Sequence, residues 1–322
     1  MRIGIAGTGS IGRRHLANLE KLCPGIKIVV LRNGITSDTY IESIDADKVT
    51  SLKIAEDEKL DAIIIANQSA KHANLIIEGL KAGLHMYIEK PVVTDREQMN
   101  QVNVQLARSG INFYTQVGCN LRFLPSLIKL KELSENGCIG KVMRASFDAG
   151  QWLPDWRPGT DHRKSYSAKP EMGGGVLLDL IHEIDMARWI LGDLTAEACN
   201  VIQAPCLEIQ TEAAATALLK SHDGCLVQIG IDYIARRPIR RYQLIGEKGT
   251  LIWDLRRKTL VLETKHEVKV IMSGSKSFDI QETYLLAMTN FLEGIQGNTM
   301  QTQTLQDGLN SAKIVLDLKD KI

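Results

Sequence analysis

The feature that most restricts the fold of this chain is a glycine-rich turn that joins an apolar segment to a helical one. Residues 2–6 read RIGIA, which is typical of a buried strand, and residues 7–12 read GTGSIG. The apolar periodicity of residues 11–22 predicts a helix directly after the turn. A strand, a tight turn and a helix in this order are the start of a βαβ unit, so the sequence predicts a parallel sheet.

Strands and helices continue to alternate through the first third of the chain. Further strands are expected at 26–33, 60–67, 84–91 and 111–120, with helices at 72–83 and 95–110. This alternation is typical of a doubly wound parallel sheet with helices on both faces. We therefore predict an α/β protein whose N-terminal Rossmann domain covers residues 1–120.

The pattern changes after residue 120. An irregular stretch at 151–175 is rich in Gly, Pro, Trp and charged residues, and a helix is expected at 176–191. Consecutive β-type segments with short connections then occupy 213–264, and the chain ends in helical segments. This order predicts a second, α+β domain at 121–322 with a mostly antiparallel sheet.

The three glycines of the first turn, Gly7, Gly9 and Gly12, have the spacing G-x-G-x-x-G. Between a strand and a helix this pattern indicates a dinucleotide site. Gly7 permits the tight turn, Gly9 lets the backbone approach a pyrophosphate, and Gly12 allows close packing of helix and strand. The N–H groups at the helix N-terminus favour the negative charge of the pyrophosphate.

The end of the second strand indicates which dinucleotide is bound. NAD-binding domains usually have an acidic residue there, but this chain has Arg32 followed by Asn33. An arginine can pair with a 2′-phosphate, so NADP is preferred over NAD, unless Arg32 is only a solvated surface residue. The candidate cofactor-binding residues are Gly7, Thr8, Gly9, Ser10, Ile11, Gly12, Arg32, Asn33, Asn67, Gln68, His72, Glu89, Lys90 and Asn120. For His72, a capping or surface role is an equal alternative.

Composition excludes several classes of partner. The formal net charge is +1 and aromatic residues make up 5% of the chain, which argues against nucleic acid and anionic membranes. No apolar run reaches the ~20 residues of a membrane span. The sequence shows no secretory leader and its six cysteines are scattered, so we expect a cytoplasmic protein with reduced thiols.

Polar residues interrupt the apolar segment GGGVLLDLIHEID at 173–185. Asp179, His182 and Asp185 are three residues apart, so on one helix they would share a face. An acid beside a histidine supports proton transfer near neutral pH. The alternatives are capping acids with a core histidine, or, less favoured, a metal site; we expect no metal.

The irregular stretch supplies candidate substrate residues. Tryptophan and arginine suit a sugar ring with an anionic group. The candidates are Arg122, Trp152, Trp156, Arg157 and Tyr166, together with Asp179 and His182. The tryptophans could instead only fix a long loop. A further basic cluster at Arg236, Arg237, Arg240 and Arg241 is interpreted as a surface or subunit-interface feature.

Three motifs in this order, GTGSIGRRH, EKP at 89–91 and GGGVLLDLIHEID, resemble the glucose–fructose oxidoreductase / inositol dehydrogenase / MocA (Gfo/Idh/MocA) family over the whole chain. The resemblance implies a C-terminal domain with a large open, mostly antiparallel sheet that serves substrate binding and oligomerisation, as a homodimer or homotetramer. It maps the catalytic lysine onto Lys90, and the acid and histidine onto Asp179 and His182. Many members space the last two four residues apart; here they are three apart.

This resemblance implies an NAD(P)-dependent oxidoreductase that acts on a hydroxyl or keto carbon of a sugar or sugar derivative, a class that includes the nucleotide-sugars of surface-polysaccharide metabolism. His182 would transfer the substrate proton, Lys90 would donate a hydrogen bond, and Asp179 would orient His182. Two alternatives stay open at this point: a lyase or glycosidase that uses NAD transiently, and a non-catalytic nucleotide-binding regulator.

Overall fold

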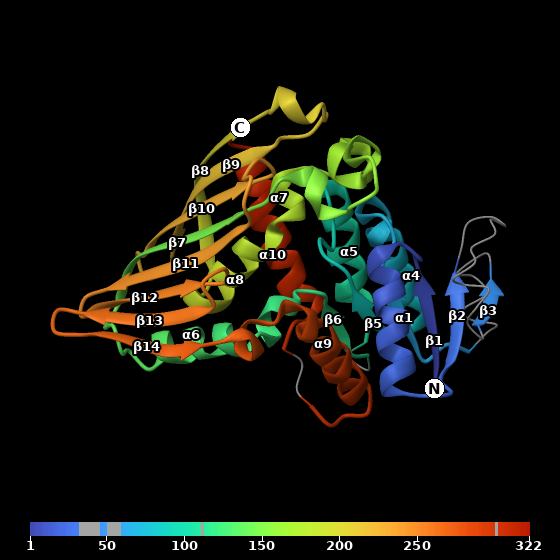
Figure 1. Cartoon of the computed structure of the whole chain (residues 1–322). Helices are drawn as coiled ribbons and strands as arrows, with labels where there is room; N and C mark the ends of the chain where they lie inside the picture. The colour runs from blue at the N-terminus through green and yellow to red at the C-terminus, as the bar shows by residue number, and fades with distance from the viewer. Residues whose placement is uncertain (32–45, 50–58, 111–112, 300–301) are drawn as a thin grey trace. The chain divides into compact units, whose positions relative to one another are not determined.

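The computed structural model of the chain describes residues 1–31, 46–49, 59–110, 113–299 and 302–322. These residues form two compact units (Figure 1). The first unit contains 1–119 and 284–309, and the second contains 120–283 and 310–322. The boundaries between the units fall within each of the last two helices, so residues 284–309 return to the first unit. The domain boundary expected from the sequence, a single one at 120/121, does not include this return. Among the described residues, no helix combines the length and the apolar character that crossing a bilayer requires.

The first unit is built on a parallel sheet of six strands in the order β3-β2-β1-β4-β5-β6. The strands are β1 (Arg2–Ala6), β2 (Lys27–Leu31), β3 (Ala46–Val49), β4 (Ala62–Ile65), β5 (His85–Ile88) and β6 (Thr115–Val117). The connecting helices are α1 (Ser10–Leu22), α4 (His72–Ala82) and α5 (Arg96–Arg108). β4 reads AIII and is buried along its whole length, as expected of a strand covered on both faces.

The last part of the chain completes this unit beside β6. In α9 (Ile280–Ile295), Phe291 packs edge-on against Tyr87 of β5, with ring centroids 5.5 Å apart. The amide of Gln116 donates to the carbonyl of Ala287 at 2.7 Å, and the amide of Gln303 donates to the carbonyl of Cys119 at 2.8 Å. β6 is short and lies at the edge of the sheet, and the backbone N–H of its Val117 donates to the carbonyl of Gln303 at 2.8 Å, which satisfies a group that the sheet alone would leave without a partner.

The second unit is built on a sheet of eight strands in the order β14-β13-β12-β11-β7-β10-β9-β8. All neighbouring pairs are antiparallel except β7 and β10. The strands are β7 (Val142–Gly150), β8 (Leu194–Ile202), β9 (Ala214–Ser221), β10 (Leu226–Asp232), β11 (Ile239–Gly246), β12 (Gly249–Asp254), β13 (Thr259–Thr264) and β14 (Val268–Ser273). The helices are α6 (Pro125–Glu135), α7 (Val176–Asp179), α8 (Ile181–Leu191) and the end of α10 (Leu305–Lys319).

Successive side chains along these strands point to opposite faces of the sheet, and the two faces differ in burial. One face carries the fully buried Phe147, Tyr242 and Trp253, and α6 and α8 pack on it. The indole N–H of Trp253 donates to the hydroxyl of Ser126 in α6 at 2.9 Å. The opposite face carries exposed apolar side chains such as Leu218 and Leu226. The predicted fold class, a Rossmann sheet followed by a large, mostly antiparallel sheet, is confirmed.

One predicted element is wrong. The helix expected at 176–191 is interrupted at Leu180, whose φ of −98° and ψ of 31° are not helical, so α7 ends at Asp179 and α8 begins at Ile181. Asp179 therefore does not lie on one continuous helical face with His182 and Asp185. The side chain of Asp179 is held by groups outside the helix, described below, which fix its direction independently of α8.

Candidate functional site

The carboxyl ends of the central parallel strands lie in register. Ala6 at the end of β1 pairs with Ile65 of β4, and Ile65 pairs with Ile88 of β5. Strand order reverses between β1 and β4, because β2 and β3 lie on one side of β1 and the later strands on the other. Ligands of open α/β sheets bind at this switch point, outside the carboxyl ends of the strands. The glycine turn, the segment at Asn67 and the segment at Lys90 all follow these ends.

The glycine turn forms a cradle in which only glycine fits at two positions, Gly7 and Gly12. Gly7 has a φ of +100°, and a Cβ there would lie 2.4 Å from the carbonyl oxygen of Ala66. A Cβ on Gly12 would lie 2.0 Å from the carbonyl oxygen of Gly7. At Gly9, by contrast, no described atom lies within 4 Å of the position that a Cβ would take. The backbone is therefore locked at Gly7 and Gly12 and open at Gly9, where a ligand would approach.

The N-terminus of α1 faces this cradle without a competing acid. α1 begins at Ser10, its N-cap is Gly9, and among the described residues no side chain caps its first N–H groups. Its first turn contains no acidic residue. The positive end of the helix is therefore available to an anion. The residues present fit the pyrophosphate of a dinucleotide.

The segment after β4 is held by His72. Its Nδ1 lies 2.8 Å from the carbonyl oxygen of Pro91 and its Nε2 lies 3.1 Å from that of Asn67. His72 is 1% exposed, and burial lowers the pKa of its imidazole. The ring thus ties the segment at Asn67 to the segment after Lys90, a structural role, and its predicted contact with the cofactor stays a prediction. The Oδ1 of Asn67 is buried and has no hydrogen-bond partner among the described residues, so it could accept a bond from a ligand.

Glu89 is buried and paired. Its Oε1 lies 2.8 Å from Nε2 of His15, which is fully buried on α1. Gly118 leaves room for this carboxylate, since a Cβ there would lie 2.8 Å from Oε1. The pair joins the helix of the glycine cradle to the segment that follows β5, which contains the half-buried Lys90. The side chain of Glu89 is therefore held in place by His15, and Lys90 is the next residue in the chain.

Asp179 is held by three hydroxyl groups in the second unit. Tyr166 donates to its Oδ1, and Ser167 and Tyr233 donate to its Oδ2 at 2.6 and 2.9 Å. Burial raises the pKa of Tyr166 and of Tyr233 well above 10, and the charge of Asp179 raises both further. Both phenols therefore remain protonated donors at physiological pH. The predicted orientation of His182 by Asp179 stays a prediction.

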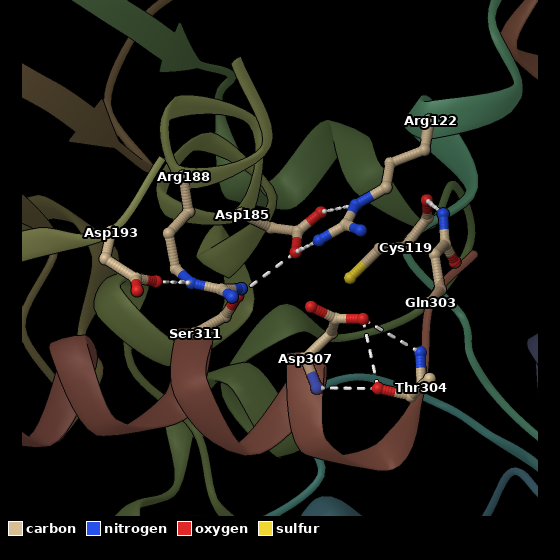
Figure 2. Close-up of polar contacts among 9 residues, drawn as sticks. All are labelled: Cys119, Arg122, Asp185, Arg188, Asp193, Gln303, Thr304, Asp307 and Ser311. Atoms are coloured by element: carbon tan, nitrogen blue, oxygen red, sulfur yellow. Dashed lines mark hydrogen bonds and ion pairs between the residues drawn. The ribbon is translucent and has the colours of Figure 1, made fainter. Parts of the chain in front are cut away.

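His182 itself is half-buried near the start of α8, and the acids on either side of it along the chain are buried. Asp185, 1% exposed, accepts from Nε and Nη2 of Arg122 at 2.9 and 2.6 Å (Figure 2). Ser311 of α10 donates to the same carboxylate at 3.1 Å and accepts from Arg188 at 3.2 Å. These bonds fix α8 in the second unit. The contact of Arg122 with substrate stays a prediction.

The remaining candidates from the irregular stretch make contacts between rings and guanidinium groups. Trp156 lies edge-on to Tyr233 with centroids 5.3 Å apart, and its indole N–H donates to the carbonyl of Gln151. The guanidinium of Arg236 stacks on Trp152 at 3.5 Å. The guanidinium of Arg157 lies 5.0 Å from the ring of Tyr166. Trp156 and Arg157 thus contact the two tyrosines that donate to Asp179, and the contacts of both tryptophans also support the alternative that they fix the loop.

Two candidate residues, Arg32 and Asn33, lie outside the described residues. Gln68 is exposed after β4, and Asn120 is buried in the second unit with its amide donating to Thr283 at 2.6 Å. Lys90 belongs to the first unit and His182 to the second. Three residues were missed at the sequence level: His15, Ser167 and Tyr233. Of these, His15 could have been found, because it lies with Leu16 and Leu19 on the apolar face of α1.

Comparison with known proteins identifies the family. Residues 1–116 match the model of the oxidoreductase family with an NAD-binding Rossmann fold, and residues 127–252 match that of the GFO/IDH/MocA C-terminal domain. The chain is 27% identical to the uncharacterized oxidoreductase YrbE of Bacillus subtilis, covering 97% of this chain and 91% of that protein. It is 25% identical to myo-inositol 2-dehydrogenase of Thermotoga maritima, covering 96% and 92%.

Solved structures share the fold. A levoglucosan dehydrogenase in complex with NADH superposes with a TM-score of 0.84 at 16% identity, covering 100% of this chain and 96% of that one. The myo-inositol 2-dehydrogenase of Lactobacillus plantarum gives a TM-score of 0.80 at 22% identity, covering 100% and 96%. This chain is an oxidoreductase with an NAD-binding Rossmann domain, and it belongs to the Gfo/Idh/MocA family.

Proposed function

We propose that the protein transfers hydride between a nicotinamide dinucleotide and a hydroxyl or keto carbon of a sugar or sugar derivative. The observation that carries the proposal is the glycine cradle at Gly7–Gly12, open at Gly9 and aligned in the sheet with the segment of Lys90. Relatives named as inositol and levoglucosan dehydrogenases support a cyclic polyol or sugar as the substrate class.

The chain's own residues would bind the cofactor along the carboxyl edge of the parallel sheet. Gly7–Gly12 and the first N–H groups of α1 would hold the pyrophosphate, and Asn67 and Glu89–Lys90 would line the nicotinamide half. When bound, the cofactor supplies hydride transfer to or from the substrate carbon. NADP is our preferred cofactor, with NAD as the alternative, because Arg32 and Asn33 stand where NAD-binding domains usually have an acid.

Proton transfer is assigned to His182. In the oxidation direction its imidazole would take the hydroxyl proton of the substrate, and in reduction it would return it. Lys90 would donate a hydrogen bond to the same oxygen and stabilise its negative charge. Asp179, fixed by its three hydroxyl donors, would orient His182 electrostatically. This assignment requires Lys90 and His182 to reach the same carbinol in the working enzyme.

The second domain, residues 121–322, would bind the substrate and form the oligomer. Trp156 packs on Tyr233 and Arg157 on Tyr166, both tyrosines donate to Asp179, and together with Trp152 these side chains suit contact with a sugar ring. The uncovered apolar face of the eight-stranded sheet, with Leu218 and Leu226, suits a homodimer or homotetramer in the cytoplasm.

Single substitutions test the assignment by separating turnover from cofactor binding. His182→Ala and Lys90→Met should each lower kcat by about 10²–10⁴-fold, since a general acid or base contributes that much. Dinucleotide affinity should stay within about twofold in His182→Ala, and Lys90→Met should still bind the dinucleotide through the glycine cradle. His222→Ala, at a histidine that is 96% exposed, is the matched control and should keep full kcat. The measurement is net change in the near-ultraviolet absorbance of reduced nicotinamide over a panel of sugars and cyclitols.

Full turnover in both variants would remove Lys90 and His182 from the mechanism. Consumption of substrate with no net absorbance change would identify an enzyme that uses the dinucleotide transiently. Tight dinucleotide binding with no turnover over the whole panel would favour a regulatory protein.

A further inference from the structure

Glu89 is a buried carboxylate at the carboxyl edge of the parallel sheet. It is 7% exposed and directly follows β5, and its backbone N–H donates to the carbonyl of Ile65, the last residue of β4, at 2.8 Å. The carboxylate lies against the backbone of Gly118, which follows β6, since a Cβ there would lie 2.8 Å from Oε1 and 2.9 Å from Oε2. The charge of Glu89 is therefore fixed at the edge along which the proposed function places the nicotinamide half of the dinucleotide.

The hydrogen-bond partner of this carboxylate is His15 of α1. Its Nε2 lies 2.8 Å from Oε1, and no lysine or arginine nitrogen of the described residues lies within 4 Å of either oxygen. His15 is fully buried, and its Nδ1 has no hydrogen-bond partner in the described part of the chain. A protonated ring would carry an N–H at Nδ1, and burying an N–H without an acceptor is costly. This geometry favours a neutral imidazole that donates from Nε2, so the pair keeps the negative charge of Glu89.

The other titratable groups around Glu89 do not cancel this charge. Burial raises the pKa of Tyr87 well above 10, and the charge of Glu89 raises it further; the ring of Tyr87 lies edge-on to that of His15, with centroids 4.8 Å apart. Burial lowers the pKa of His72, so this ring is also neutral at physiological pH. The ammonium of Lys90 is directed to the substrate oxygen in the proposed function. A buried carboxylate without a paired cation is costly, and a bound cation would remove that cost.

A nicotinamide dinucleotide supplies such a cation in one of its two states. The nicotinamide ring carries one positive charge when it is oxidised and none when it is reduced, and charges placed near the ring alter this balance. A negative charge near the ring in a buried site favours the oxidised form, because the attraction is screened less there than in water. His15 holds the carboxylate in place before the cofactor binds, so the charge needs no reorganisation.

From these observations we infer that Glu89 and His15 set the balance between oxidised and reduced dinucleotide on this protein. The charge of Glu89 stabilises the oxidised nicotinamide, and His15 holds that charge in place without neutralising it. The inference rests on the proposed function. It gives Glu89 an electrostatic role separate from the hydrogen bond assigned to Lys90, and it makes the bound reduced dinucleotide a better hydride donor.

The ratio of two dissociation constants tests the inference without turnover. Calorimetric titration in the absence of sugar measures Kd for the oxidised and the reduced form of both couples, NADP and NAD. In Glu89→Gln, the ratio of the oxidised to the reduced Kd should rise by at least about fivefold. Glu89→Asp keeps the charge, so its ratio should lie closer to that of the wild type. The matched control Glu20→Gln removes an exposed acid from the same helix as His15, and its ratio should stay within about twofold of the wild type.

Two further variants keep the test decisive if Glu89→Gln folds poorly. In His15→Gln the new amide can still donate to Glu89, so the charge remains and the ratio should stay within about twofold of the wild type. In H15Q/E89Q a hydrogen bond between two amides replaces the pair without any charge, so the ratio should rise as in Glu89→Gln.

Three outcomes would overturn the inference. One is a ratio in Glu89→Gln or H15Q/E89Q equal to that of the wild type, including the case in which both Kd values rise together, because the pair would then only shape the site. Another is a fall of the ratio in His15→Gln, because His15 would then carry a positive charge that neutralises Glu89 in the wild type. The third is a wild type that binds neither form of either couple, which would refute the proposed function as well. Dinucleotide binding with an unchanged ratio refutes the inference alone.

Discussion

Asp185→Asn removes the charge of one partner in a buried ion pair while keeping the shape of the side chain. Asp185 is 1% exposed and Arg122 is 8% exposed, so water does not replace the lost carboxylate oxygen. Removing one partner of a buried pair costs about 3–5 kcal/mol, because a charge remains buried without compensation. We expect a value of about 3 kcal/mol, since the asparagine oxygen can still accept one of the two bonds from Arg122.

Scanning calorimetry measures this cost as a shift in Tm. At about 2–4 °C per kcal/mol for a domain of this size, Asp185→Asn should lower Tm by about 6–12 °C. Asp193→Asn is the matched control, because Asp193 is 86% exposed and lies 3.4 Å from Nε of Arg188 in the same network. An exposed pair of this kind contributes about 0.2–1 kcal/mol, so the control should change Tm by less than about 4 °C.

A third variant separates lost charge from lost packing. Arg122→Met with Asp185→Leu removes both charges and fills the site with apolar side chains, so it should be more stable than Asp185→Asn alone. Equal Tm values for Asp185→Asn and Asp193→Asn would refute the reasoning, since the pair would then contribute no more than a surface contact. A double variant less stable than Asp185→Asn would show that packing dominates over charge.

Two further substitutions in the first unit have defined outcomes. Gly118→Ala should lower the free energy of unfolding by about 1–3 kcal/mol, because the new Cβ would lie 2.8 Å from Oε1 of Glu89, which His15 holds in place. Gly110→Ala, with no described atom within 4 Å of its Cβ position, should be neutral in the same urea titration. For His72, burial lowers the pKa in the folded state below 6.5, so the unfolded chain takes up a proton at a higher pH than the native one. The stability that His72 contributes is therefore present above pH ~6.5 and lost as pH falls below it. The urea midpoint of the wild type should fall more steeply between pH 7.5 and 5 than that of His72→Gln. Parallel pH dependences of the two midpoints would contradict this.

The sequence is informative about the parts of the fold that local patterns control. The strand, glycine turn and helix at residues 2–22 follow from short-range spacing, and the two glycines that cannot carry a Cβ, Gly7 and Gly12, are those that the motif requires. The predicted change from alternating elements to consecutive strands after residue 120 likewise reflects local apolar periodicity. These features led to the correct fold class and family.

The break at Leu180 could not be predicted in this way. Residues 176–191 contain neither Gly nor Pro, and their apolar spacing is that of one helix. The hydroxyls that hold Asp179 come from 12, 13 and 54 residues away in the chain. The return of residues 284–309 to the first unit has the same origin, because Phe291 packs on Tyr87, which is far away in sequence. Contacts between residues that are far apart in the sequence cannot be predicted from local apolar periodicity.

The four polar residues of LLDLIHEID have different surroundings, and the difference explains why an apolar segment contains them. Asp179, Glu183 and Asp185 are at most 2% exposed, and each is bound by partners from other elements: three hydroxyls, Tyr242 with Arg240, and Arg122 with Ser311. A buried carboxylate without partners is costly, so each of the three acids is stable in only one position relative to its partners. Apolar packing alone tolerates small shifts of a helix, whereas a buried carboxylate bound by partners from another element does not. Glu183 and Asp185 therefore fix α8, which carries the half-buried His182, while Asp179 is fixed separately at the end of α7.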